Sequence, residues 1–151
     1  MCNHISEEFL TNCGEYVIDL AIRNVKAGGL PFAAIIVNQN GEIIGKGVNQ
    51  VAKHLDCTAH AEIQAIREAS RNEKNVSLKG MTLIASGEPC TLCYMAIRMA
   101  NIMNVIIVAE DMRRKNRGSI IYGPTSISIP PFFMISKLRR LIMTGNYSHS
   151  V

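Results

Sequence analysis

Residues 57–66 of this sequence read CTAHAEIQAI and place His60 and Glu62 at the head of a helix that we predict from about 59 to 71. On the shaft of a helix, residues two apart point to different sides and cannot face one another. Beyond the N-terminal end of the helix, two such side chains can reach around the same point from two directions. The spacing therefore predicts a shared target in front of the helix rather than along its flank.

The stretch PCTLC, residues 89–93, supplies further candidates for this target. Pro89 suits the first turn of a helix. Cys90 and Cys93 lie three apart, so both thiols face the same side of that turn. A helix N-terminus favours the thiolate, which is the form that binds metal. If this helix and the one at His60 begin at adjacent strand ends, their N-termini converge outside the sheet, where ligand sites of α/β proteins usually lie.

One imidazole and two thiolates suit zinc, so we predict a zinc site formed by His60, Cys90 and Cys93. Three protein ligands leave the fourth position for water, which is the pattern of a catalytic zinc, and Glu62 is the expected proton carrier beside it. The alternative adds Cys57 to give a closed Cys3His set, as in a structural zinc-binding module that is not an enzyme. We favour the open site, because a structural zinc does not account for Glu62 at the helix head.

Apolar runs and helical spacing around these motifs predict a single α/β domain over residues 1–151. The expected strands cover 32–37, 42–49, 80–86, 104–110 and a short fifth segment at 119–123, and the expected helices cover 6–27, about 59–71, 90–102 and 132–143. The alternation of strands and helices predicts a sheet with parallel pairs, flanked by helices. We expect a loop from Gln50 to Thr58. Met95, Met99 and Met103 recur with helical spacing and are expected to fill the core.

Composition and charge limit the class of protein. The chain has 151 residues, of which 48% are apolar and 19% charged, as in an ordinary globular protein. Its N-terminus does not resemble a secretory signal, and its apolar runs are too short to span a bilayer, so we expect a cytoplasmic location and no membrane partner. All twelve acids lie at or before Asp111 with nine Lys/Arg residues, giving −3, and the remaining seven Lys/Arg residues give the rest of the chain +7. This basic segment keeps nucleic acid among the candidate partners.

The motif HAE together with PCTLC resembles the cytidine deaminase superfamily, whose signature is H-x-E followed by P-C-x-x-C. The longer forms TAHAEIQAI and EPCTLC are similar to the branch that contains guanine deaminase, cytosine deaminase and tRNA adenosine deaminase. The resemblance implies a three-layer α/β/α sandwich with a mixed, about five-stranded sheet, and a zinc-dependent enzyme that hydrolyses an amino group from a base. It also implies a homodimer.

The resemblance assigns roles to individual positions. One zinc ion per chain would be held by His60, Cys90 and Cys93, and Glu62 would act as the general acid and base. The positions that match substrate contacts of the family are the side chain of Asn49, the backbone N–H of Ala61 and the ring of Phe32.

The substrate is expected to be a free nucleobase or small nucleoside, most like guanine, because GGLPF, residues 28–32, resembles the guanine deaminase branch. A tRNA-specific adenosine deaminase is the second hypothesis. Its supporting feature is a basic cluster that would hold phosphates, formed by Arg113, Arg114, Lys115 and Arg117. A cytosine or cytidine deaminase is the third.

Overall fold

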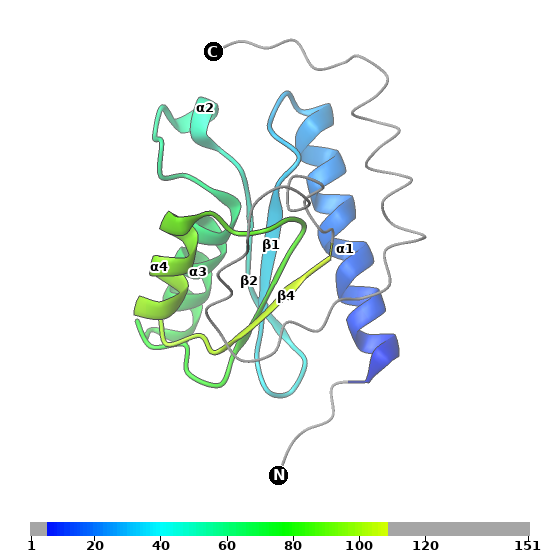
Figure 1. Ribbon diagram of the computed structural model, residues 1–151, viewed down its shortest axis with the longest axis vertical. Helices are drawn as coiled ribbons and strands as arrows, with labels where there is room; N and C mark the ends of the chain where they lie inside the picture. Colours follow the sequence, from blue (N-terminus) through cyan, green and yellow to red (C-terminus); the bar gives the residue numbers. More distant parts are fainter. Residues whose placement is uncertain (1–5, 109–151) are drawn as a thin grey trace, which may run out of the picture.

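A computed structural model describes residues 6–108 of the chain, and its sheet has the strand order β2-β1-β3-β4 (Figure 1). The strands are β1 Ala33–Val37, β2 Ile43–Val48, β3 Thr82–Ala85 and β4 Asn104–Ile107. β1 pairs antiparallel with both β2 and β3, whereas β3 and β4 are parallel. β2, β3 and β4 therefore run in one direction and β1 runs against them, which confirms the predicted mixed sheet.

Helices cover both faces of this sheet (Figure 1). Helix α1, Glu7–Lys26, packs on one face, and α3, Ala61–Glu73, and α4, Thr91–Met99, pack on the other. The three-layer α/β/α arrangement expected from the sequence is thus present in the described part of the chain.

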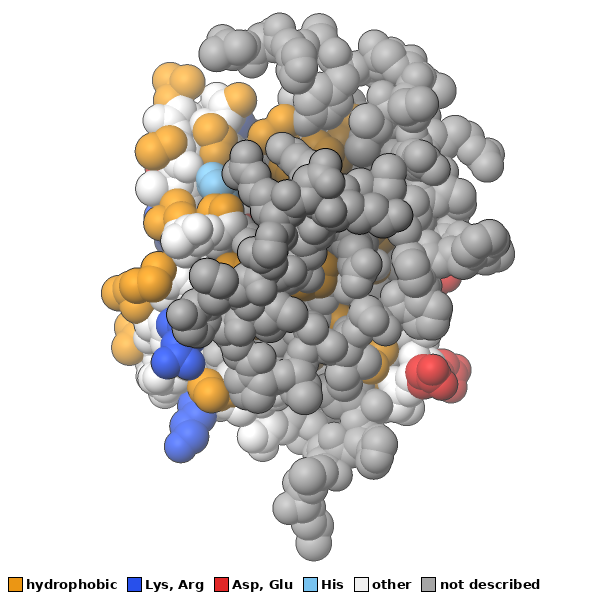
Figure 2. All heavy atoms as spheres, in the orientation of Figure 1, with side chains coloured by type: hydrophobic (Ala, Val, Ile, Leu, Met, Phe, Trp, Pro, Cys, Tyr) orange, Lys and Arg blue, Asp and Glu red, His pale blue; other side chains and the backbone are white. Residues whose placement is uncertain are grey.

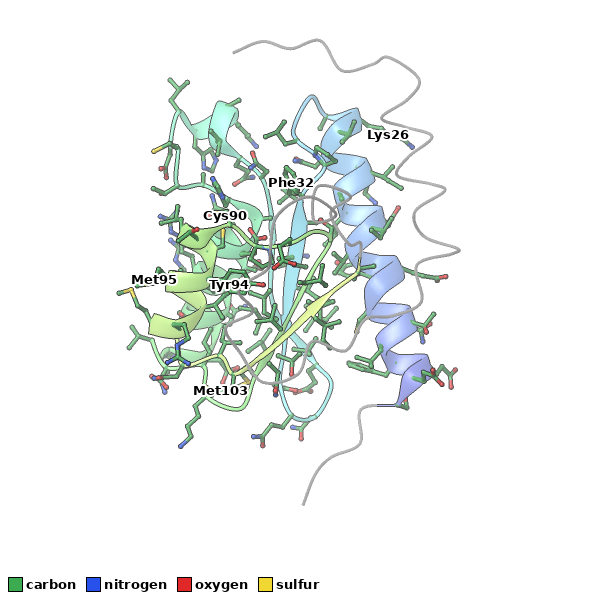
Figure 3. All side chains as sticks on the ribbon, in the orientation of Figure 1. Lys26, Phe32, Cys90, Tyr94, Met95 and Met103 are labelled. Carbon is green, nitrogen blue, oxygen red and sulfur yellow. The ribbon has the colours of Figure 1, made fainter. Side chains whose placement is uncertain are left out.

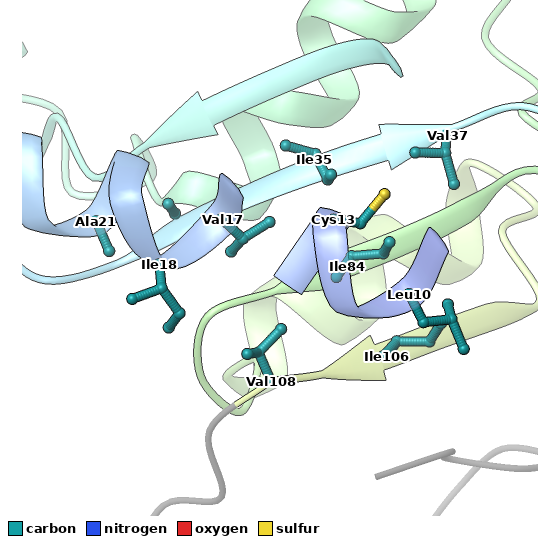
Figure 4. Close-up of a cluster of buried hydrophobic side chains, with 11 residues drawn as sticks. Leu10, Cys13, Val17, Ile18, Ala21, Ile35, Val37, Ile84, Ile106 and Val108 are labelled. Atoms are coloured by element: carbon teal, nitrogen blue, oxygen red, sulfur yellow. The ribbon is translucent and has the colours of Figure 1, made fainter. Parts of the chain in front are cut away.

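β1 explains why the run FAAIIV is apolar throughout. All five residues of the strand are buried, and alternate side chains enter opposite layers. Ile35 and Val37 join the cluster under α1, drawn in Figure 4, whereas Ala34 and Ile36 join the cluster under α3 and α4. A strand that is covered on both faces loses the polar alternation of a half-exposed strand.

Local sequence rules account for the ends of α1. The Ser6 hydroxyl accepts a hydrogen bond from the Phe9 N–H at 3.2 Å, and Glu7 and Glu8 occupy the first turn, where the helix dipole favours negative charge. The helix ends before Gly28, whose φ of +88° is readily adopted only by glycine. The predicted bounds of 6–27 agree with this helix to within one residue.

The first two predicted strands form a β-hairpin, since β1 and β2 pair antiparallel across a short turn. The Asn38 side-chain oxygen accepts hydrogen bonds from the N–H groups of Asn40, at 3.0 Å, and Glu42, at 2.9 Å. Gly41 has a φ of +83°, a conformation that glycine adopts readily. The side chain of Asn38 therefore organises the turn formed by NQNG, residues 38–41.

The structure corrects three sequence-based expectations. The predicted loop contains a one-turn helix, α2, over Val51–His54. The helices that carry the motifs begin one or two residues later than predicted, because His60 and Cys90 have extended backbones, so Pro89 precedes the cap of α4 instead of lying in its first turn. The three methionines are not core residues, since Met95, Met99 and Met103 are 58%, 80% and 51% exposed. The predicted segments 119–123 and 132–143 lie outside the described residues.

Candidate active site

The two helices that carry the motifs start at the same edge of the sheet. α3 follows β2 and α4 follows β3, and these strands run in the same direction with β1 between them. The N-terminal caps are His60 for α3 and Cys90 for α4, and neither makes the side-chain hydrogen bond that a capping residue usually makes. Their side chains are therefore available for another partner at the point where the helix ends meet.

The spacing of these side chains is suitable for binding a zinc ion. His60 Nδ1 lies 3.5 Å from both Cys90 Sγ and Cys93 Sγ, and the two sulfur atoms are 3.6 Å apart. In a tetrahedral zinc site, two sulfur ligands lie about 3.8 Å apart and a sulfur and a nitrogen ligand about 3.6 Å apart, given the usual Zn–S and Zn–N bond lengths. The three side chains thus already have the spacing of three corners of a tetrahedron, and one imidazole with two thiols is a donor set that zinc prefers.

Glu62 lies beside this triangle without belonging to it. It is buried in the first turn of α3, and its Oε2 accepts a hydrogen bond from the Cys93 thiol at 3.2 Å. Burial raises the pKa of the Cys93 thiol far above its usual range, and the charge and hydrogen bond of Glu62 raise it further. A metal that binds there must displace this proton, and Glu62 is the base in contact with it.

Glycines in β2 bring α3 close to the sheet. A Cβ atom added at Gly47 would lie 2.2 Å from the Ala61 carbonyl oxygen and 2.5 Å from the Ala65 nitrogen, and one at Gly45 would lie 2.5 Å from the Ala65 carbonyl oxygen. Ala61 and Ala65 are fully buried on the facing side of the helix. Because both glycines lack side chains, the backbone of α3 can pack directly against β2. This contact sets the distance of α3 from the sheet, and with it the position of His60.

The three predicted substrate contacts lie at the same sheet edge. Asn49 follows β2, is 8% exposed, and donates its backbone N–H to the Phe32 carbonyl oxygen at 3.0 Å. Phe32 precedes β1, is exposed, and has its ring 3.7 Å from the Cβ position of Gly87 in the loop that leads to Cys90. In the view of Figure 3 it lies between the Lys26 end of α1 and Cys90. Ala61 is the first residue of α3, so its N–H has no acceptor within the helix.

The structure does not bring Cys57 into the metal group. Its thiol is free and exposed, and the residues that could hold one ion together are His60, Cys90 and Cys93 among those described. Among the residues that the structure describes, the closed Cys3His set of the alternative is therefore not assembled, whereas the set of His60, Cys90 and Cys93 is.

The turn at residues 56–58, which precedes and positions His60, was not predicted from the sequence. The Asp56 carboxylate accepts hydrogen bonds from the Thr58 N–H at 2.8 Å and hydroxyl at 2.7 Å, and these bonds lower the pKa of Asp56. The His60 N–H then donates to the Thr58 carbonyl oxygen at 2.8 Å. The D-x-T pattern at 56–58 is the kind of sequence that forms such an Asx turn, and it could have been recognised.

Comparison with known proteins identifies the family. Residues 8–109 match the family described as the cytidine and deoxycytidylate deaminase zinc-binding region. The chain belongs to this family. The matched range contains His60, Glu62, Cys90 and Cys93. The match confirms the resemblance and, by the description of the family, the zinc that it implies.

Individual relatives include enzymes with two kinds of substrate. A tRNA-specific adenosine deaminase of Haemophilus influenzae is 35% identical over 115 residues, covering 76% of this chain and 66% of its own length, and one of Aquifex aeolicus is 40% identical over 111 residues, or 71% of each chain. A guanine deaminase of Bacillus subtilis is 36% identical over 132 residues, covering 82% of this chain and 84% of its own length. These names agree with the prediction of an enzyme of the deaminase class.

Solved structures show the same two groups. A structure from a study of tRNA:A34 deaminases has a TM-score of 0.67 at 28% identity and covers 78% of this chain and 97% of its own. The structure of the guanine deaminase from Bacillus subtilis has a TM-score of 0.65 at 28% identity, covering 93% of this chain and 98% of its own. Both confirm the predicted fold. Within residues 6–108, none of the helices combines the length and the apolar character needed to cross a bilayer.

Proposed function

We propose that this protein is a zinc-dependent hydrolytic deaminase of a free purine base, with guanine as the first candidate. The observation that carries the proposal is the placement of a buried carboxylate, Glu62, next to the triangle of His60, Cys90 and Cys93 where two helix N-termini meet. Bound zinc supplies a Lewis acid that activates water at neutral pH. His60, Cys90 and Cys93 would hold it, and three protein ligands are the usual number in a catalytic zinc site.

The role of Glu62 is to move protons. Its carboxylate is largely removed from solvent, so a proton that it accepts is not lost to bulk water. Glu62 takes one proton from the attacking water and passes it to the ring nitrogen as water adds. It then takes the remaining proton from the added hydroxyl group and passes it to the departing amine, so that a carbonyl forms and ammonia leaves. Its position in the first turn of α3, rather than among the ligands, keeps it free for this transfer.

Three groups orient the base. Asn49 Oδ1 accepts a hydrogen bond from the Val51 N–H at 3.3 Å, which leaves its NH2 group to donate to an acceptor on the ring. The Ala61 N–H is a second donor, placed next to Glu62 in the chain. The Phe32 ring supplies an exposed aromatic surface at the same edge, suited to contact with a planar base.

Two observations support guanine over a base within tRNA. The match to guanine deaminase of Bacillus subtilis covers 82% of this chain, more than the match to the tRNA-specific enzyme of Haemophilus influenzae, at 76%. Phe32, in the stretch LPF at 30–32, also resembles an aromatic residue of the guanine deaminase branch. The second candidate, a tRNA adenosine deaminase, is favoured by the several relatives that bear that name and by the basic residues at 113–117, which lie outside the described part of the chain.

Ammonia release tests the proposal across guanine, adenine, cytosine, their nucleosides and tRNA. We expect guanine to be deaminated and Glu62→Ala to reduce the rate by about 10²–10⁴-fold while zinc remains bound, because the change removes the proton carrier and no metal ligand. If tRNA is the sole substrate and binds with a steep dependence on salt, the second candidate is correct. An inactive wild type, or a fully active Glu62→Ala, contradicts the mechanism.

We also propose that two copies associate through α4. The large apolar side chains of Leu92, Met95 and Met99 on α4, and of Met103 after it, are 43–80% exposed, and Figure 3 shows Met95 directed away from the sheet. Figure 2 shows apolar side chains along the side of the molecule where α4 lies. Contact with a second copy would bury them. Light scattering is expected to give twice the mass of the chain; the mass of a single chain contradicts the proposal.

A further inference from the structure

Asn24 joins two segments that are distant in sequence. It lies in the last two turns of α1, and its side-chain Nδ2 donates hydrogen bonds to the Leu30 carbonyl oxygen at 2.8 Å and to the Asn49 carbonyl oxygen at 3.0 Å. One amide group therefore uses both of its N–H bonds to hold two backbone carbonyls from different parts of the chain.

These two segments carry the residues that we place against the base. Leu30 precedes Phe32 by two residues, and the Phe32 N–H donates to the Leu30 carbonyl oxygen at 2.8 Å. The Phe32 carbonyl oxygen in turn accepts the Asn49 N–H at 3.0 Å. Asn24 thus completes a closed ring of hydrogen bonds with Leu30, Phe32 and Asn49, in which Phe32 and Asn49 are the proposed base contacts.

Gly29 is an independent sign that the chain accommodates this amide. A Cβ atom at Gly29 would lie 2.5 Å from Asn24 Nδ2 and 2.8 Å from its Oδ1. The Gly29 N–H also donates to the Asn24 carbonyl oxygen at 2.8 Å, so the two residues are held together. The amide can occupy its bridging position because residue 29 has no side chain.

We propose that Asn24 is a positioning residue that fixes the separation of Phe32 and Asn49 and so determines how well the base binds. This inference rests on the proposed function, since it takes Phe32 and Asn49 as substrate contacts. Asn24 itself touches neither the metal ligands nor Glu62 through any hydrogen bond that it makes in the described structure. Its effect is therefore expected on KM rather than on kcat.

Asn24→Asp is the sharpest change, because it keeps the size of the side chain and replaces the donor by a carboxylate facing two carbonyl oxygens. We expect KM for the base to rise about tenfold, kcat to stay within about twofold, and zinc content to remain unchanged. Gly29→Ala displaces the same amide from the other side and is expected to raise KM in the same direction. The double variant should lose less than the product of the two single effects, since both remove one interaction.

Asn72→Asp is the matched control. The Asn72 Nδ2 donates to the Ile44 carbonyl oxygen at 2.8 Å, which is also a helix amide bonded to a backbone carbonyl, but at the opposite end of β2 from Asn49. We expect it to leave KM at the wild-type value. If Asn24→Asp also leaves KM at the wild-type value while both variants lose similar stability, Asn24 is merely structural and the inference is wrong.

Hydrogen exchange separates this inference from the proposed function. In Asn24→Asp the backbone N–H groups of Phe32 and Asn49 should exchange faster than in wild type, and in Asn72→Asp they should not. Unchanged exchange at both sites in Asn24→Asp overturns the positioning role, whatever the enzyme acts on. A wild type that deaminates no base, with faster exchange in Asn24→Asp, instead contradicts the proposed function and supports the bridge.

Discussion

The helix on one face of the sheet and the two helices on the other begin in opposite ways. α1 starts with Ser6, whose hydroxyl accepts a hydrogen bond from the first turn, and its acidic residues suit the helix dipole. α3 and α4 start with His60 and Cys90, which make no such bond. A missing cap typically costs about 1 kcal/mol, so two helices at one sheet edge forgo a stabilising feature that the third retains. Local rules are commonly broken where side chains serve a functional site, which is the role that we propose for His60 and Cys90.

The two faces of the sheet also differ in the size of the side chains that pack between helix and sheet. Under α1, branched side chains such as Val17, Ile18 and Ile35 fill the space between helix and sheet (Figure 4). Under α3, the helix contributes Ala61, Ala65 and Ala69 against glycines of β2, so the backbones approach closely. Large side chains stabilise the fold through the apolar area that they bury, and they tolerate small shifts of the helix. Direct contact between the backbones leaves the helix little freedom to shift. The face that carries the proposed ligands is the one whose helix height is most tightly fixed.

The largest expected effect comes from removing a proposed ligand. We expect Cys93→Ser to lose most of its bound zinc and to lower deamination by more than about 100-fold, since even partners of metal ligands are commonly worth 10–100-fold. Metal analysis and ammonia release measure both quantities. Cys57→Ser is the control, because that thiol is exposed and outside the metal group, and it should retain zinc and activity. Loss of zinc from Cys57→Ser would instead show that Cys57 is a fourth ligand, as in the closed Cys3His site.

The second prediction compares the two faces directly. Gly47→Ala forces a methyl group against the backbone of α3, and we expect it to lower the free energy of unfolding by about 3 kcal/mol and to weaken zinc binding, because His60 must move with Ala61. Val17→Ala on α1 should cost about 2 kcal/mol through lost burial and leave zinc binding unchanged.

Denaturant titration and competition with a zinc chelator measure the two effects. Equal losses of zinc affinity in the two variants would show that general instability, rather than the height of α3, controls the site. The comparison between the faces would then fail.

The sequence predicts the motif residues well because their spacing reports local geometry. A residue pair three apart at a helix start, such as Cys90 and Cys93, faces one side wherever the helix lies. Asn24 could not be found in this way, since its carbonyl partners lie 6 and 25 residues away and an asparagine near a helix end follows no period. The exposure of Met99 was missed for a related reason. Helical spacing shows which residues share a face, but only the packed structure shows whether another layer covers it.

The smallest expected effect tests whether the ordinary cap on α1 is purely structural. Ser6→Ala removes the hydrogen bond to the Phe9 N–H and should lower the free energy of unfolding by about 1 kcal/mol. Ser6 lies at the end of α1 farthest from Asn24, so zinc content, kcat and KM should match wild type. Thermal unfolding and steady-state kinetics measure these quantities. If KM changes in Ser6→Ala, α1 transmits strain along its length to the base contacts, and the two faces are not as separate as their packing indicates.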